Sequence, residues 1–285
     1  MIRLDAATVL LQWATGGLLF LWVTTRRREV GIGYGWLLRS TYLVMALGAV
    51  AAGRILGPVA VRDAAALGVA VAAGVALVLS IVRRRAGVRG ERARRERRTA
   101  RVAAMTGIER EPAPLDEDVR EFPPAADLVA PVIGAVGLVA AGLAAGGPDA
   151  LAVARTLIGA AFLGAVTDAM LLGHWYLVQP GLGRAPLLEL NRWLGIVWPL
   201  EVAALLWPVG MLSVLSGSVD DGWGGLLGWF WVACAVTTIV LVVVTKAALK
   251  ERAYSAVMAA TGLLYLAILT AFGTDLVARA VLASG

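Results

Sequence analysis

The fold is decided by residues 164–208, which read GAVTDAMLLGHWYLVQPGLGRAPLLELNRWLGIVWPLEVAALLWP. Two apolar runs in this stretch are separated by a short connector that contains Gln179, Pro180, Gly181, Gly183 and Pro186. Because proline lacks a backbone N–H and glycine favours turns, the two runs cannot form one continuous helix. The pattern therefore predicts a helical hairpin, and each arm is long enough to cross a membrane.

Each arm of the hairpin carries one carboxylate well inside its apolar run. Asp168 lies eight residues before Tyr176, and Glu201 lies eight residues after Trp193. If those aromatic residues mark the membrane boundary, a rise of about 1.5 Å per residue places both carboxylates at a depth of roughly 12 Å. A charged group there costs roughly 2.5 to 3.5 kcal/mol and normally faces the bundle interior or water. Asp168 and Glu201 are therefore the leading candidates for proton or ion coupling.

The same carboxylates also have a purely structural interpretation. Arg39, Arg155 and Lys246 lie in or beside other apolar runs, which makes them the candidate charge partners. Separate ion pairs would fix the registry of neighbouring helices. Two close carboxyls that share a proton would instead carry protons or bind a cation. The sequence leaves both interpretations open.

Aromatic and polar residues gather where the first arm ends. His174, Trp175 and Tyr176 are consecutive, and Arg184 follows in the connector. Such groups can bind a polar head with an aromatic ring, for example a quinone, or relay a proton. The alternative is a histidine satisfied within an interfacial aromatic belt. A quinone-binding subunit would need a redox protein partner, because this chain offers almost no metal ligands.

Composition identifies a membrane protein and excludes several kinds of site. The chain is 59% hydrophobic and only 16% charged, with a mean hydropathy of +0.78, which is too apolar for a soluble domain of this size. A single Cys234 and a single His174 exclude an internal disulfide, a Cys/His zinc site and a bis-histidine haem. No Walker, GxSxG or HExxH motif assigns an enzymatic reaction. We therefore predict no metal and no cofactor.

The remaining apolar runs predict an all-α polytopic bundle of about eight transmembrane helices in one membrane domain. The expected spans are 7–25, 36–52, 64–82, 128–145, 151–176, 193–215, 226–244 and 256–272. Three of them fall within residues 1–82 and five within residues 127–285. An arginine-rich loop, residues 83–126, lies between the two groups and turns acidic in its second half.

The distribution of basic residues predicts the orientation in the cell membrane. Basic connectors alternate with connectors that carry almost no positive charge, and the basic ones surround Arg26, Arg83, Arg184 and Lys246. The positive-inside rule then places the long loop in the cytoplasm and both termini outside, with Arg54 and Arg62 as a minor exception. The basic block from Arg83 to Arg101 is either a topology signal or a surface for anionic lipid. Because the net charge of +6 comes mainly from the arginine-rich block between Arg83 and Arg120, it does not indicate a nucleic-acid-binding surface.

Three functions follow from these patterns. The first is proton- or ion-coupled transport through Asp168 and Glu201. The second is a quinone-binding membrane subunit of a redox complex, with its site near His174 and Arg184. The third is a non-catalytic assembly or scaffold protein, in which intramembrane charges only fix helix pairing.

Overall fold

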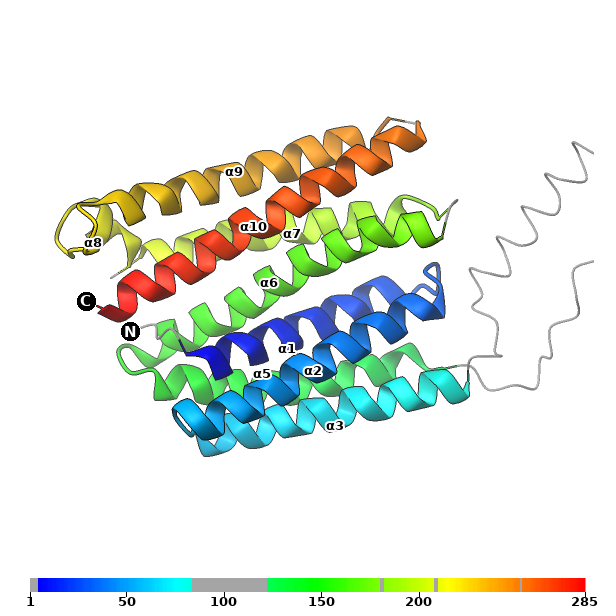
Figure 1. Ribbon diagram of the computed structural model, residues 1–285, viewed down its shortest axis with the longest axis horizontal. Helices are drawn as coiled ribbons and strands as arrows, with labels where there is room; N and C mark the ends of the chain where they lie inside the picture. Colours follow the sequence, from blue (N-terminus) through cyan, green and yellow to red (C-terminus); the bar gives the residue numbers. More distant parts are fainter. Residues whose placement is uncertain (1–4, 84–121, 180–181, 208–209, 252, 285) are drawn as a thin grey trace, which may run out of the picture.

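The computed structural model describes residues 5–83, 122–179, 182–207, 210–251 and 253–284, and over these ranges it is a bundle of long helices (Figure 1). Seven of the described helices are long and apolar enough to cross a membrane, so the predicted all-α, multi-pass membrane fold is confirmed. The long helices are α1 (Ala6–Thr25), α2 (Ile32–Leu56), α3 (Ala60–Val82), α5 (Val129–Ala144), α6 (Asp149–Val178), α7 (Ala185–Leu206), α9 (Leu226–Ala248) and α10 (Tyr254–Ser284). The short ones are the 3-10 helix η1 (Pro124–Leu128) and α8 (Met211–Leu215).

Helix α7 is the one of these eight long helices that is not among the seven candidate spans. It contains Glu189, Arg192 and Glu201, with Pro199 in its interior, and it packs beside α6 and α9. The expected span 193–215 is therefore wrong in its bounds, since α7 begins and ends earlier and α8 is a separate helix. The end of α7 follows from the next residue in the sequence, because Trp207 has the extended backbone (φ −128°, ψ 152°) that a residue preceding a proline prefers.

The long helices alternate in direction, which gives the bundle two distinct ends. Both termini lie at one end, together with α8, and we call this the terminal end (Figure 1). At the other end, which we call the loop end, α3 stops and η1 begins (Figure 1). The turns after α1, α6 and α9 also lie at the loop end. The basic connectors near Arg26, Arg184 and Lys246 therefore gather at one end of the bundle, as their sequence positions predict.

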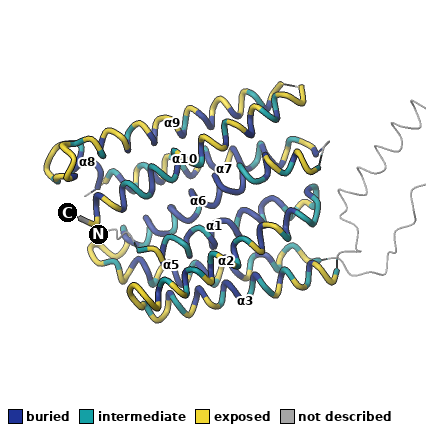
Figure 2. Tube along the Cα trace, in the orientation of Figure 1, coloured by how far each residue is buried: buried dark blue, intermediate teal, exposed yellow. Residues whose placement is uncertain are grey.

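Helices α1 and α6 form the centre of the bundle, and their backbones touch. A Cβ atom on Gly16 would lie 1.7 Å from the Ala160 carbonyl oxygen, and one on Gly164 would lie 2.1 Å from the Gly16 carbonyl carbon. Glycine is thus required on both sides of this crossing. The peripheral helices carry many exposed residues (Figure 2). On α3 these include the apolar Val71, Val75 and Val78. This surface suits contact with the lipid bilayer.

Most of the arginine-rich loop, residues 84–121, lies outside the described residues. The structure therefore carries no account of the expected lipid-binding surface from Arg83 to Arg101, which stays a prediction. Within the described part of the expected loop, Phe122 comes first and η1 begins at Pro124.

Candidate functional site

Glu201 lies in a buried group of four ionisable side chains near the terminal end, which we call the buried ionic cluster. Its carboxyl is fully buried and within hydrogen-bonding reach of the Asp275 carboxyl. It also interacts electrostatically with Arg279 and, more weakly, with Arg155. The cluster therefore joins three long helices, because Glu201 is on α7, Arg155 is on α6, and Asp275 and Arg279 are on α10.

The two arginines of the cluster are held by different bonds. Arg279 Nε donates to both Asp275 oxygens, at 2.9 and 2.8 Å, one helical turn away on α10. Arg155 Nε donates to the Ala204 carbonyl oxygen at 2.7 Å. In a continuing helix the residue four positions later would donate to that carbonyl, but residue 208 is proline and has no N–H. Arg155 therefore supplies a donor that the end of α7 lacks.

Several buried atoms at this site have no hydrogen-bonding partner. No donor reaches either Glu201 oxygen, no acceptor reaches Arg279 Nη2, and Gln12 Oε1 on α1 is also unpartnered. The ionisable group that interacts most strongly with Glu201 is another carboxyl, that of Asp275, which accepts but cannot donate when ionised. Two such carboxyls can hold one proton between them, and this proton would join them by a hydrogen bond.

The space for this cluster is made by Gly159 on α6. A Cβ atom there would lie 2.9 Å from both Arg279 Nη2 and Gln12 Nε2, and 3.2 Å from Asp275 Oδ1. Gln12 Nε2 in turn donates to the Thr156 carbonyl oxygen at 2.7 Å. The neutral amide of α1 thus borders the charged groups of α10 across a glycine.

Asp168 lies in a second buried site, between α6 and α2. The Tyr42 hydroxyl donates to Asp168 Oδ1, while the Tyr34 hydroxyl donates to the Asp168 backbone oxygen at 3.2 Å. Asp168 Oδ2 has no partner. Gly17 on α1 makes room for the phenol, because a Cβ atom there would lie 1.9 Å from Tyr42 Cζ.

The structure does not place the Asp168 and Glu201 carboxyls at the same depth. Asp168 is ten residues from the loop-end terminus of α6 at Val178, whereas Glu201 is sixteen residues from that of α7 at Ala185. At about 1.5 Å per residue, these positions are roughly 15 and 24 Å from the loop end. The equal depths expected from the sequence assumed that Tyr176 and Trp193 mark the same membrane boundary, but α6 ends two residues after Tyr176, whereas α7 begins eight residues before Trp193.

One of the three candidate charge partners joins the buried ionic cluster. Arg155 interacts with Glu201, as already described. Arg39 instead binds Asp127, with Nε to Oδ1 at 2.8 Å and Nη2 to Oδ2 at 2.7 Å, and both side chains are buried. Lys246 is exposed near the loop end of α9. Arg39 and Lys246 are thus placed away from Glu201.

The candidate quinone ligands contact four different parts of the molecule. His174 is exposed, with Nδ1 at 3.3 Å from the Tyr265 hydroxyl, and the Trp175 indole donates to Gln179 Oε1 at 3.0 Å. The Tyr176 hydroxyl donates to the Gly183 carbonyl oxygen at 2.5 Å. Arg184 donates to the carbonyl oxygens of Leu249 and Ala253 in the turn between α9 and α10. These bonds stabilise the connectors at the loop end, and none of them joins two of the four side chains.

Sequence reasoning missed Asp275 and Arg279. The apolar run was taken to end at Phe272, but α10 continues to Ser284. A signal was present, since an aspartate and an arginine four residues apart lie on one helix face and favour a helix there.

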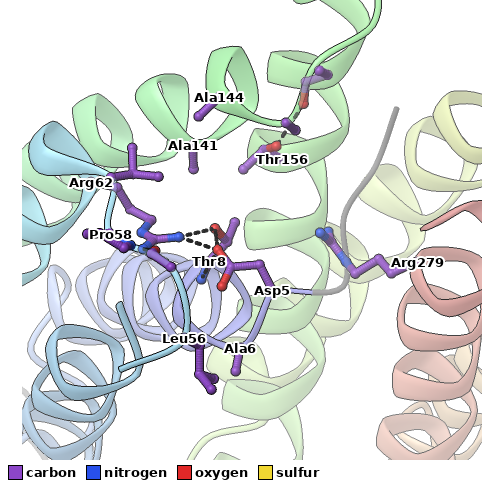
Figure 3. Close-up of a pocket in the computed structure, with 14 residues that line it drawn as sticks. Asp5, Ala6, Thr8, Leu56, Pro58, Arg62, Ala141, Ala144, Thr156 and Arg279 are labelled. Atoms are coloured by element: carbon purple, nitrogen blue, oxygen red, sulfur yellow. Dashed lines mark hydrogen bonds and ion pairs between the residues drawn. The ribbon is translucent and has the colours of Figure 1, made fainter. Parts of the chain in front are cut away.

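A cavity of about 340 Å³ lies at the terminal end, next to the cluster. The start of α1, the turn between α2 and α3, the adjoining ends of α5 and α6, and Arg279 of α10 line this terminal cavity (Figure 3). Arg62 lies on one side of it, where Nε donates to Asp63 Oδ1 at 2.8 Å and Nη2 to the Gly57 carbonyl oxygen at 2.7 Å. Arg62 Nη1 also donates to Asp5 (Figure 3).

Comparisons with known proteins leave the function to be argued from geometry. No protein-family model, curated protein or solved structure matches the chain. Among the described residues, no group of three or more His, Cys, Asp or Glu side chains could hold a metal ion. The candidate sites are therefore the buried ionic cluster, the Asp168 site and the terminal cavity.

Proposed function

We propose that this multi-pass membrane protein is a proton-coupled transport protein, whose exchangeable proton is held between Glu201 and Asp275. One observation carries the proposal: both Glu201 oxygens are buried, and they face a second carboxyl instead of a donor. In a purely structural ion network, nearly every buried polar atom has a partner. A site that binds and releases a proton must instead tolerate a change of charge.

The charge balance of the cluster fits this role. Arg155 and Arg279 contribute two positive charges, and two ionised carboxylates would cancel them. With one proton on the carboxyl pair, the cluster carries one net positive charge. Proton binding therefore changes the cluster from neutral to cationic, and this difference is what can be coupled to a second ligand or to a conformational change.

Asp168 is proposed as a second proton-binding position in the same bundle. It lies closer to the loop end than Glu201 and has one unpartnered oxygen. Following the basic connectors, we place the loop end in the cytoplasm and the terminal end outside the cell membrane. A proton entering from outside would then meet Glu201 before Asp168.

Proton flux into proteoliposomes tests the proposal directly. A potassium gradient with valinomycin drives protons inward, and an enclosed pH-sensitive dye reports them. Glu201→Gln should lower the flux at least about tenfold, because the amide cannot take up the proton. Asp168→Asn should also lower it.

The matched control is Glu189→Gln on the same helix. Glu189 pairs with Arg26 and Arg27 near the loop end, away from the cluster. This variant should keep the wild-type flux. Wild-type flux in a folded Glu201→Gln protein would refute the proposal.

The assembly or scaffold function is the second candidate, and the links between helices favour it. Arg155 bonds α6 to the end of α7, and the cluster also ties both helices to α10. Under this hypothesis the charges only fix helix pairing, and loss of Glu201 would destabilise the bundle. The sign of that stability change separates the two candidates and is predicted in the Discussion.

A further inference from the structure

The terminal cavity contains a buried cation with unused donor capacity. Arg279 is 1% exposed, lines the cavity, and has no partner at Nη2. Its Nε alone serves both Asp275 oxygens, so the carboxylate does not occupy the side of the guanidinium that carries Nη2. Figure 3 shows the Arg279 guanidinium directed toward the middle of the cavity.

The other charged groups of the cavity already have partners. Arg62 donates to Asp5, Asp63 and the Gly57 carbonyl oxygen. Asp5 also accepts from the backbone N–H groups of Ala7 and Thr8. Asp5 interacts with Arg279 only electrostatically and more weakly than Asp275 or Glu201 does, and neither group accepts a hydrogen bond from Arg279 Nη2. A ligand that brings an anionic oxygen would supply the acceptor that Arg279 lacks.

The rest of the lining limits the ligand's size and character. Ala141, Ala144, Ala145 and Ala152 present methyl groups, and Leu56 and Val59 add further apolar surface. A volume of about 340 Å³ suits a small solute. The cavity thus combines one charged end with an apolar wall, as a short-chain carboxylate or a lipid phosphate with its glycerol would require.

We propose that the terminal cavity binds a small anion through its oxygen atoms at Arg279, and that this anion binds together with the proton of the Glu201–Asp275 pair. Only the second half rests on the proposed function. With the proton bound, the cluster carries a net positive charge that attracts an anion. Without the proton, the cluster is neutral and the attraction is weaker.

The groups that face Glu201 support this assignment. Helix α7 packs against α1, α6, α8 and α9, and Glu201 also meets α10. Helices α1 and α8 contain no charged residue, and the only one in α9, Lys246, is near the loop end. Among the residues that the structure describes, the charged groups that interact with Glu201 are therefore Arg155, Asp275 and Arg279.

Calorimetry on the purified protein in phosphatidylcholine nanodiscs tests anion binding, with acetate, lactate and phosphate as probes. At least one probe should bind saturably. Lactate, which is ionised throughout, should bind at least about fivefold more tightly when the pH is lowered by about two units from neutral. Glu201→Gln, which holds the pair permanently at the charge of its protonated state, should abolish this pH dependence.

Two variants locate the site. Ala144→Phe places a ring in the cavity from an exposed position and should weaken binding at least about tenfold, whereas Leu143→Phe is the matched control. Leu143 is 51% exposed, does not line the cavity, and should leave binding unchanged. The double variant Arg279→Gln/Asp275→Asn removes the guanidinium without stranding a charge and should abolish binding.

A second arm distinguishes a lipid from a free solute. Phosphatidylglycerol nanodiscs are analysed by native mass spectrometry, and a retained lipid that Ala144→Phe releases would identify a lipid headgroup as the anion. If neither the free probes nor phosphatidylglycerol binds, or if Ala144→Phe changes nothing, the anion site is refuted. Anion binding that is independent of pH would refute the coupling and leave the anion site standing. Proton flux that depends on Glu201 without any anion binding would refute the anion site and leave the proposed function standing.

Discussion

Two buried arginine–aspartate pairs in this bundle differ in bonding geometry, although each arginine has one terminal nitrogen without a partner. Arg39 and Asp127 pair through two parallel bonds, and Asp127 also accepts from the Thr25 hydroxyl at 3.3 Å. The Phe122 ring covers the Arg39 guanidinium at 4.5 Å. Arg279 instead binds Asp275 through one nitrogen, beside a Glu201 carboxyl that no donor reaches.

Under the proposed function, this difference separates a structural ion pair from a group of charges that can change state. The Arg39–Asp127 pair joins α2 to η1, and its fork geometry favours one charge state of both groups. The buried ionic cluster contains two carboxyls, those of Asp275 and Glu201, whereas direct pairing with Arg279 requires only one. Similar residue types at similar burial therefore carry different expectations, and the following variants test them in order of expected effect.

The largest loss of stability is expected for Asp127→Asn. The substitution leaves the Arg39 cation buried without its counter-ion, which costs about 3 to 5 kcal/mol. Thermal unfolding in detergent should show a large fall in melting temperature. The double variant Arg39→Met/Asp127→Leu should recover most of it, because well-packed apolar groups can replace a buried pair. A single variant as stable as wild type would show that the pair does not lock α2 to η1.

The next largest loss of stability is expected for Gly164→Ala, because the added methyl group would push apart α1 and α6. These two central helices border both the Arg39–Asp127 pair and the buried ionic cluster. The added Cβ would meet the Gly16 carbonyl carbon at 2.1 Å, and backbone cannot yield as a side chain can. We expect a cost of about 1 to 3 kcal/mol in thermal unfolding. Gly262→Ala in α10 is the control, since its Cβ would have nothing within 4 Å, and it should be neutral or slightly stabilising.

The variant Tyr42→Phe tests whether the Asp168 site behaves like the Arg39–Asp127 site or like the buried ionic cluster. Loss of the hydroxyl leaves Asp168 Oδ1 without the donor that now serves it. If the site behaves like the Arg39–Asp127 pair, the variant should lose about 1 to 3 kcal/mol of unfolding free energy. Tyr265→Phe, at an exposed hydroxyl near the loop end, should change stability very little. Equal effects of the two variants would show that Asp168 does not depend on Tyr42.

Glu201→Gln should be neutral or slightly stabilising while proton flux falls. If the pair already holds a proton, the amide keeps the shape and removes no charge that Arg279 needs. If Glu201 were ionised and paired with an arginine, the same change would strand a cation and cost about 3 to 5 kcal/mol. A markedly lower melting temperature, rescued by also neutralising Arg155 or Arg279, would favour the scaffold function.

The smallest effect is expected outside the bundle, at Asp221. Its carboxylate accepts from the backbone N–H groups of Gly225 at 2.8 Å and Trp223 at 2.9 Å. Hydrogen bonds from Gly225 first, and then from its neighbours, lower the pKa of Asp221. The carboxylate therefore stabilises the connector fully above its unfolded pKa of about 3.9, and this stabilisation is lost as pH falls through the lower folded pKa.

Asp221→Asn should therefore lower the melting temperature slightly near neutral pH and flatten its dependence on pH below about 4. Melting curves across that range measure both effects. The neighbouring Asp220 is exposed and accepts from the Gly222 N–H, so Asp220→Asn is the matched control. If the melting temperature of Asp221→Asn depended on acidic pH as that of the wild type does, this carboxylate would not stabilise the connector.

Hydropathy predicts the bundle because burial in lipid requires long apolar helices, whatever their neighbours. It cannot identify which side chains pair across helices, because the pairing depends on the rotation of each helix about its own axis and on the length of each helix. Asp127 adjoined the expected loop and gave no sign of pairing with Arg39, 88 residues away. Asp275 fell beyond the last apolar run, although the helix continues through it. Glu201 was conspicuous as a carboxyl inside an apolar run, but its expected depth depended on a helix start that the apolar pattern places eight residues late.

Helices α6 and α10 contain 30 and 31 residues, so each is about 45 Å long, whereas the hydrocarbon of a typical bilayer is about 30 Å thick. Each must therefore tilt or project beyond the acyl chains. Both carry groups of the buried ionic cluster toward the terminal end, so a change of tilt would move Arg155 and Asp275 relative to Glu201 on the shorter α7. Bilayer thickness thus becomes a control on this protein: lipids with longer acyl chains should draw α6 and α10 upright and alter the contact between the two carboxyls.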